Sequence, residues 1–398
     1  MTDLEPILTL WRELEAAGAD YVLAAVVAVE GSSYRRPGAH MLLAHDGRRS
    51  GTVSGGCLEA DVAKRAWWLT ENGPTVERFS TIEEDGERPY GSGCGGIVHL
   101  LLERRQTAAP LLSALQSAFN QRMPMAIATI LKGPCICERA IASVAGSLPE
   151  NPQSSGAPSF RRPFGERVGD HKSEIEQVGH ELQPLADLAL ENRASFERSI
   201  LIEGEHIRVW ADYRPARPGL WIFGAGDDAK PLLRLAREIG WFVAIADGRS
   251  HLATRDRFPA ADEVDALDIS ALPESARFDL RPADAAVVMT HSFEQDSRIL
   301  ASLLARDTPP AYIGVLGPQR RTRELLMEAA RLLHLPAHDD RIDLWLSAVH
   351  APTGLDVGAE TPAAIALSIL AEIQQTLNHG TGAPLRVVRA AKLEVAHG

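Results

Sequence analysis

The chain has 398 residues, of which 45% are hydrophobic and 24% are charged, a composition typical of a folded protein with two or three domains. Its 41 basic and 53 acidic side chains give a net charge of −12, which argues against nucleic acid or an anionic membrane as a partner. No apolar run is as long as a membrane span, and residues 1–18 are acidic and amphipathic rather than signal-like. We therefore expect a cytoplasmic protein with no membrane partner.

The first 131 residues alternate between helical and strand patterns, which predicts a mixed α+β domain. Residues 4–17 carry an apolar stripe at helical spacing, and the Val-rich run after Gly18 predicts a buried strand. Asp46-Gly47 is typical of a hairpin turn. The expected elements in chain order are helix 4–17, strands 21–29, 41–44 and 49–53, a helix ending at Glu71, strands 75–80 and 97–102, helix 108–120 and strand 125–131.

Residues 132–198 differ in composition from what precedes them. Pro, Gly and Ser dominate residues 147–174, and no periodicity is evident, which predicts a loop or a mobile insertion. A strand or hairpin at 199–213 then leads to Arg217-Pro218. The expected organisation is a domain at 1–131, an insertion with connecting strands at 132–217, a further domain at 218–378 and an unassigned tail at 379–398.

The third region opens with an apolar run, LWIF, that enters a glycine turn, GAGDDA, and then a helical pattern. In a dinucleotide-binding turn Gly224 would make the tight bend and Gly226 would let a pyrophosphate approach the backbone. Asp247 ends the next apolar run, 21 residues after Gly226, near the spacing of a ribose-binding carboxylate. The alternative is a structural domain with a glycine-rich turn. Asp227 and Asp228 place negative charge where the phosphate would lie.

The remaining C-terminal pattern predicts a doubly wound parallel sheet of the Rossmann type. Thr290-His291 follows a strand at its carboxyl end, where open α/β sheets bind ligands, so His291 is either a ligand-binding or an ordinary surface histidine. The expected elements are strands 285–290 and 312–316 and helices 294–305, a basic one after Gly317-Pro318, and 363–376.

The cysteines form no CxxC pair, which argues against a zinc knuckle or a thioredoxin-type motif. Cys57, in the turn Ser54-Gly55-Gly56-Cys57, would stand at or just before a helix N-terminus, a setting that favours the thiolate. Gly55 and Gly56 would leave space beside it, whereas Glu59 in the first helical turn opposes the effect slightly. The alternative is a small packing cysteine. Cys94, in the second glycine cluster at 91–96, suggests a cleft shared by the two loops.

Two further observations concern ligands. Arg35 and Arg36 lie beside Ser32 and Ser33 and could hold a phosphate, although a solvated basic turn explains either arginine equally well. No general acid is paired with a substrate-binding arginine in the pattern of a dehydrogenase.

These motifs resemble the XdhC/CoxI family of xanthine dehydrogenase accessory factors. The resemblance rests on GSSYRRPGAHMLLAHDGRRSGTVSGGCLEADV, GCGG, LWIFGAGDDAKPL, ADGR, THSFEQD, YIGVLG and GLDVGAETPAAIALSILAEI. It leaves residues 132–198 and the tail unexplained. It implies an N-terminal family domain followed by a Rossmann-like domain.

The resemblance also implies a role in binding molybdenum cofactor, as molybdopterin or its dinucleotide form. The protein would assist sulfuration of the cofactor by a cysteine desulfurase and its delivery to a molybdenum hydroxylase, acting as a homodimer. It implies reactive thiols at Cys57 and Cys94, with Cys57 as a metal ligand. The implied cofactor-binding positions are Arg36, Gly55, Gly56, Glu59, Gly224, Gly226 and Asp247. His291 is a further candidate because of its place at the end of a strand. The alternative functions are those of an NAD(P)-dependent oxidoreductase and of a regulatory protein that senses a nucleotide.

Overall fold

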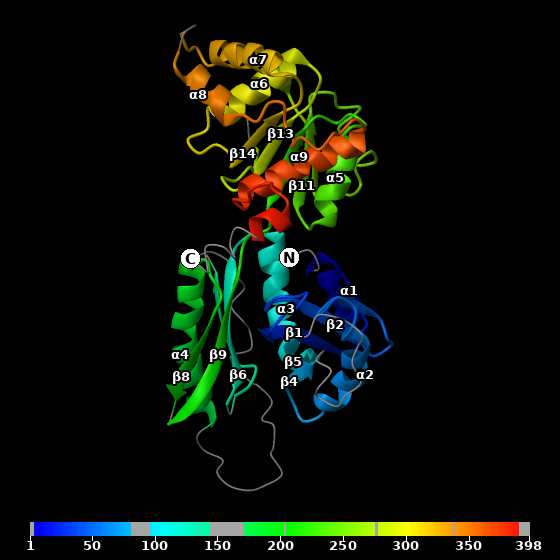
Figure 1. The fold of residues 1–398 in the computed structure, drawn as a ribbon, viewed down its shortest axis with the longest axis vertical. Helices are drawn as coiled ribbons and strands as arrows, with labels where there is room; N and C mark the ends of the chain where they lie inside the picture. Colours follow the sequence, from blue (N-terminus) through cyan, green and yellow to red (C-terminus); the bar gives the residue numbers. More distant parts are fainter. Residues whose placement is uncertain are drawn as a thin grey trace. The chain divides into compact units, whose positions relative to one another are not determined.

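The computed structural model describes residues 4–80, 96–133, 135–143, 171–202, 204–274, 278–336 and 339–389, without the side chains of 171–177 and 202. The chain divides into two compact units, Met1–Arg217 and Pro218–Gly398, and each is taken by itself below (Figure 1). Within the described residues, no helix is long and apolar enough to cross a bilayer.

The first unit begins with an antiparallel sheet whose strand order is β3-β2-β1-β5-β4. The central strand β1 has seven consecutive buried residues, as expected for a strand covered on both faces. Helices α1 and α3 cover one face through Leu8 and Leu112, and α2 covers the other through Val62. The bounds are α1 Leu4–Ala16, β1 Tyr21–Glu30, β2 His40–Ala44, β3 Arg49–Gly51, α2 Glu59–Leu69, β4 Thr75–Ser80, β5 Ile97–Arg104 and α3 Arg105–Asn120.

A second antiparallel sheet in this unit has the order β7-β6-β9-β8 and is covered by α4. The prediction of a loop at residues 147–174 was wrong for residues 171–174, where α4 begins; β7, the rest of α4 and the start of β8 also lie within 132–198. Residues 144–170 lie outside the described part. The helical signal existed in Val178, Leu182 and Leu185, which pack on the sheet. The bounds are β6 Met125–Lys132, β7 Arg139–Ser143, α4 His171–Asn192, β8 Phe196–Ile202 and β9 Glu205–Arg214.

The second unit confirms the predicted Rossmann-like sheet. Its five strands are all parallel, in the order β12-β11-β10-β13-β14. The strand order reverses between β10 and β13. Sheets of this type bind ligands beside such a reversal, at the carboxyl ends of the strands. Every residue of β10, β13 and β14 is buried. The bounds are β10 Gly219–Phe223, β11 Phe242–Asp247, β12 Glu263–Ala266, β13 Ala285–Val288 and β14 Tyr312–Val315.

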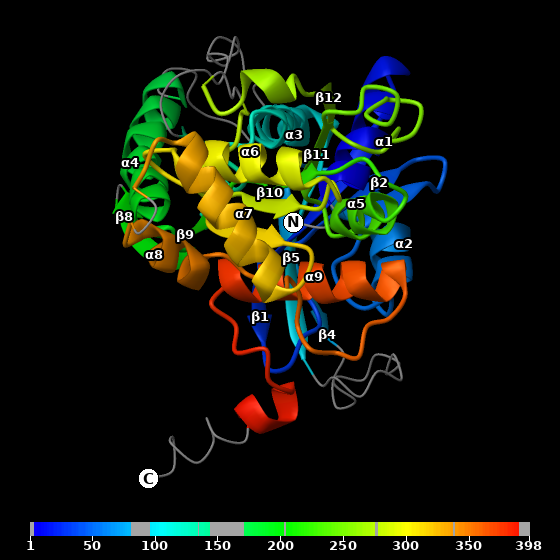
Figure 2. The same ribbon diagram turned by 90° about the horizontal axis from the view of Figure 1, so that it is seen from above.

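Helices cover both faces of this sheet. Two apolar clusters lie on opposite faces, one with α5 and α9 and the other with α6, α7 and α8, and α6 runs beside α7 (Figure 2). Ser292 caps α6 by accepting from the Gln295 amide, and Thr361 caps α9 in the same way, as Ser and Thr commonly do. The bounds are α5 Ala229–Glu238, the 3-10 turn η2 Ile269–Ala271, α6 Phe293–Leu304, α7 Gln319–Leu332, α8 Arg341–Ala348 and α9 Pro362–Leu377.

Candidate functional site

The turn between β3 and α2 is built around the buried carboxylate of Glu59, which is 3% exposed. Its Oε1 accepts from the amides of Ser54 at 2.8 Å and Val53 at 3.2 Å, and its Oε2 accepts from the Ser54 hydroxyl at 2.6 Å. The same hydroxyl oxygen accepts from the amides of Gly56 and Leu58. Glu59 and Ser54 therefore fix the backbone of the turn that carries Cys57.

The ionisation of Glu59 follows from these contacts. Burial alone raises the pKa of a carboxyl group, but the hydrogen bonds from Ser54 and Val53 outweigh burial and hold the pKa of Glu59 below its ordinary value. Glu59 is thus ionised at neutral pH. The carboxylate oxygens of Glu59 bind groups of the turn itself. Glu59 therefore positions the turn and does not contact a ligand directly.

The glycines leave one side of this turn open. Gly56 has a positive φ of 111°, which favours glycine, and a Cβ built on it would meet nothing within 4 Å. A Cβ on Gly55 would lie 3.5 Å from the ring of Tyr34. Cys57 lies two residues before the first residue of α2. Its free thiol is half-buried and has no hydrogen-bond partner among the described residues.

The loop that carries the arginine pair lies against the same turn. Arg35 Nε donates to the Thr52 hydroxyl at 2.7 Å, just before the Ser54 turn. At the other side, a Cβ on Gly96 would clash with the Ser32 carbonyl oxygen, so the chain leaving the second glycine cluster packs against this loop. Cys94 lies outside the described residues.

A pocket of about 430 Å³ adjoins the arginine loop in the first unit. Arg35, Arg36 and Arg214 are among its lining residues, together with Leu4 and Ile7. Arg214 is fixed by its bonds to Asp212 Oδ2 at 2.8 Å and to the Gly38 carbonyl oxygen at 2.7 Å. The Arg36 side chain is exposed and has no partner in the described part of the chain. Its guanidinium is available to an anion.

His40 also lines this pocket but does not add to its charge. Burial, aided by the nearby guanidinium of Arg214, lowers the pKa of His40 well below the ordinary value for histidine. The imidazole is therefore neutral at pH 7. The lining contains three arginines and one aspartate, Asp212, so its net charge is about +2.

Cys137 belongs to a different environment. Its thiol donates to Glu103 Oε2 at 3.0 Å, and Arg139 pairs with the same carboxylate. Burial raises the pKa of the Cys137 thiol well above its ordinary value, and Glu103 adds to the effect. Such a thiol is unreactive at neutral pH.

In the second unit, Gly224 and Gly226 form the turn between β10 and α5. Gly224 has a φ of 140°, and a Cβ there would lie 2.5 Å from the Met289 carbonyl oxygen, so glycine is required. A Cβ on Gly226 would clash with Asp228 Oδ1. The space beside Gly226 thus holds a carboxylate of the chain itself.

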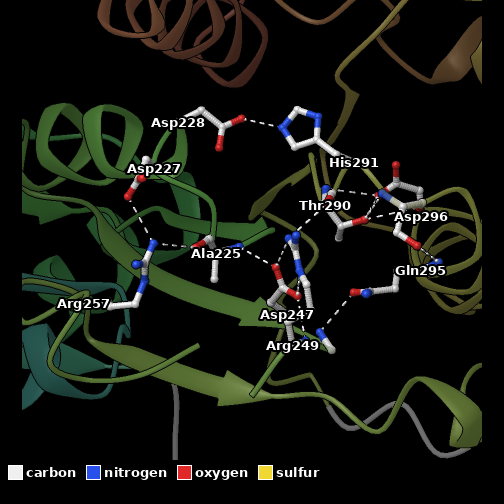
Figure 3. A network of polar contacts seen from close by, with 12 residues as sticks. Ala225, Asp227, Asp228, Asp247, Arg249, Arg257, Thr290, His291, Gln295 and Asp296 are labelled. Atoms are coloured by element: carbon white, nitrogen blue, oxygen red, sulfur yellow. Dashed lines mark hydrogen bonds and ion pairs between the residues drawn. The ribbon is translucent and has the colours of Figure 1, made fainter. Parts of the chain in front are cut away.

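Asp247 follows β11 at the carboxyl edge of the sheet and is 0% exposed. Its Oδ2 accepts from the Ala225 amide and from Arg249 Nη2, both at 2.7 Å, and its Oδ1 accepts from Arg249 Nε at 3.0 Å (Figure 3). Burial would raise the pKa of Asp247, but these bonds from Arg249 and Ala225 lower it below its ordinary value. Both carboxylate oxygens are engaged inside the protein.

His291 stands across the turn from α5, with Nε2 2.8 Å from Asp228 Oδ2 (Figure 3). Beside it, the buried carboxylate of Asp296 accepts from the Thr290 hydroxyl and from Arg321 Nη2, both at 2.6 Å. The Rossmann fold implies a dinucleotide, but a dinucleotide does not fit the carboxyl edge of this sheet as it stands. Asp228 fills the space beside Gly226, and Arg249 is paired with Asp247.

Sequence reasoning thus located two regions but missed the partners within them. Arg249 and Arg214 were not singled out, although Arg249 stands only two residues after Asp247, a spacing that allows a local ion pair. The structure brings Arg35 and the Cys57 turn together, and Asp228 and His291 together. The described residues contain no group of three or more His, Cys, Asp or Glu side chains that could hold a metal ion.

Comparisons with known proteins cover both units. A model described as the XdhC and CoxI family matches residues 14–80, and one described as the XdhC Rossmann domain matches residues 220–373. A protein of Bacillus subtilis (strain 168) described as a probable subunit of xanthine dehydrogenase is 31% identical over 364 residues, covering 89% of this chain and 92% of the relative.

Two further likenesses extend over nearly the whole chain. The molybdenum cofactor insertion chaperone PaoD of Escherichia coli (strain K12) is 25% identical over 386 residues, covering 95% of this chain and 90% of the relative. A crystal structure of a xanthine dehydrogenase from Bacillus halodurans matches with a TM-score of 0.65 at 27% identity, covering 95% of this chain and 96% of that chain.

Proposed function

Since this chain belongs to the XdhC and CoxI family, we propose that it is an accessory protein that binds molybdenum cofactor and inserts it into a molybdenum hydroxylase. The description of PaoD as an insertion chaperone supports this role. The single structural observation that carries it is the Cys57 turn: a half-buried free thiol, on a backbone fixed by Glu59 and opened by two glycines.

The residues of this turn suit the chemistry of such a cofactor. A cysteine thiolate is a soft ligand and suits molybdenum or sulfur. Arg36, with a free guanidinium, suits a phosphate. The bound group would supply the redox centre of the client enzyme, whereas this chain would hold the group and release it. We infer that Cys57 holds the metal end and that the arginine loop, with Arg36, holds the phosphate end.

Activation of a client tests this function. Cys57→Ser should leave the fold intact, because the hydroxyl is nearly isosteric, but should abolish activation of a cofactor-free molybdenum hydroxylase, because the hydroxyl is a poor soft-metal ligand. Cys135→Ser is the matched control and should activate normally. Full activation by Cys57→Ser would refute the assignment.

The remaining parts of the proposal concern partners and location. A cysteine desulfurase would supply sulfur to the bound cofactor, and a reducing compartment such as the cytoplasm would keep Cys57 as a thiol. Pull-down with a purified desulfurase and light scattering of the purified protein test the partner and the predicted homodimer. The oxidoreductase alternative has the parallel sheet and glycine turn in its favour, but the engaged state of Asp247 opposes it.

A further inference from the structure

Two features lead beyond the proposed function, and the first is the start of α5, where a Rossmann-type domain would bind a phosphate group. The amides of Gly226, Asp227 and Asp228 precede the helix and have no acceptor among the described residues, so donors for a phosphate are present. Yet Asp228 is not used as a side-chain cap. Its carboxylate lies against Gly226, with Oδ1 in the space that a Cβ would take.

Asp228 is held in that place from the opposite edge of the turn. His291 follows β13 and reaches across to Asp228 Oδ2, as Figure 3 shows. The neighbouring carboxylate of Asp227 points elsewhere, to Lys230 at 2.8 Å and Arg257 at 3.1 Å. Two nearby cations are therefore already engaged, and the charge beside Gly226 is negative.

The second feature is the carboxyl end of β11, where Asp247 would bind the ribose hydroxyls of a nucleotide. Asp247 is paired with Arg249, and Arg249 Nη2 also donates to the Thr290 carbonyl oxygen at 3.0 Å. This guanidinium thus spans from β11 to the end of β13, across the reversal of strand order. A ribose hydroxyl would reach Asp247 only after Arg249 had moved and left a buried carboxylate without its partner.

We propose that the nucleotide site of the C-terminal unit is occupied by the chain itself. Asp228 lies in the place of the pyrophosphate, and Arg249 lies in the place of the ribose diol. Like charge opposes a diphosphate at the first position, and the buried ion pair closes the second. The Rossmann-like unit of this protein therefore excludes NAD and NADP rather than recruiting them.

The test is a gain of binding in the full-length protein. Asp228→Ala removes the carboxylate and exposes the free amides, while the helix loses no side-chain cap. Calorimetry with ADP should show binding about tenfold tighter or more than in the wild type. Glu294→Ala removes an equal charge from the exposed first turn of α6 and should match the wild type.

Two results would overturn the proposal as a whole, and a third would overturn its statement about the ribose. One is wild-type protein that binds ADP or NAD as tightly as Asp228→Ala does. The other is a folded Asp228→Ala variant, checked by circular dichroism, with no gain for ADP. Because Asp247 stays covered in this variant, inorganic pyrophosphate should bind about as well as ADP, and a strong preference for ADP would contradict the closed ribose position. Cys57 lies in the other unit. The outcome of the client-activation test with Cys57→Ser therefore does not depend on the outcome of these binding experiments.

Discussion

Replacing Glu59 by Gln tests whether its carboxylate organises the turn that carries Cys57. The amide keeps an oxygen for the Val53 and Ser54 amides, but its NH₂ group faces the Ser54 hydroxyl, which now donates to Glu59 Oε2 at 2.6 Å. One charge-assisted hydrogen bond is lost, worth ~1.5–3 kcal/mol, and two others become neutral bonds of ~0.5–1.5 kcal/mol each. We expect the free energy of unfolding of the first unit to fall by roughly 3.5–5 kcal/mol.

Urea denaturation followed by circular dichroism measures this loss. Asp61→Asn is the matched control, because Asp61 lies in the same helical turn and, among the described residues, pairs only with Arg65, at 3.3 Å. It should cost less than about 0.5 kcal/mol. In Glu59→Gln we also expect faster alkylation of Cys57, since the turn around it loosens.

The pH dependence gives an independent check. The pKa of Glu59 in the folded protein lies below its ordinary value of 4.5, so the unfolded chain binds more protons in mild acid. The stabilisation by Glu59 is therefore complete above pH 4.5 and declines as the pH falls toward the folded-state pKa. The stability gap between wild type and Glu59→Gln should narrow over that range. A gap below about 1 kcal/mol at pH 7, or one that does not change in acid, would show that the Glu59 carboxylate does not organise this turn.

Three further predictions concern other parts of the chain. Arg249→Ala leaves the Asp247 carboxylate buried without its partner and should lower the free energy of unfolding in urea by roughly 2–4 kcal/mol. Lys230→Ala, which breaks the exposed pair with Asp227, should lower it by under about 1 kcal/mol. Equal losses in the two variants would contradict this prediction. Gly96→Ala forces a Cβ onto the Ser32 carbonyl oxygen and should lower the melting temperature, and an unchanged value would exclude that contact. Alkylation at pH 7 should label Cys57 well before Cys137, whose raised pKa keeps it protonated; equal rates would contradict the burial of Cys137.

Patterns that repeat along the chain predicted most of the fold. The apolar runs of β10, β11, β13 and β14 are short, continuous and separated by helical stretches, which only a parallel sheet covered on both faces accommodates. Residues 171–192 escaped notice because Pro184 and Gly179 interrupt the helical pattern and Pro and Gly precede it. Packing of Leu182 and Leu185 on a sheet outweighs those local signals.

The candidate site was only partly predictable for a physical reason. Sequence spacing places Gly226 and Asp247 at the edge of a sheet, but it does not say whether a side chain faces a ligand or another residue. Asp247 is engaged by Arg249, and Asp228 by His291. The role of Glu59 was likewise hidden, because its partners Ser54 and Val53 are met only when the turn folds back on α2.

The cofactor content of the purified protein shows whether the Cys57 turn holds molybdenum cofactor. Wild type and Cys57→Ser are expressed side by side, purified without oxygen, and analysed for molybdenum and pterin per chain, with circular dichroism to show that both are folded. We expect wild type to carry both molybdenum and pterin, and Cys57→Ser to lose the metal. Equal molybdenum in the two proteins, or none in the wild type, would contradict the claim that the Cys57 turn holds the cofactor.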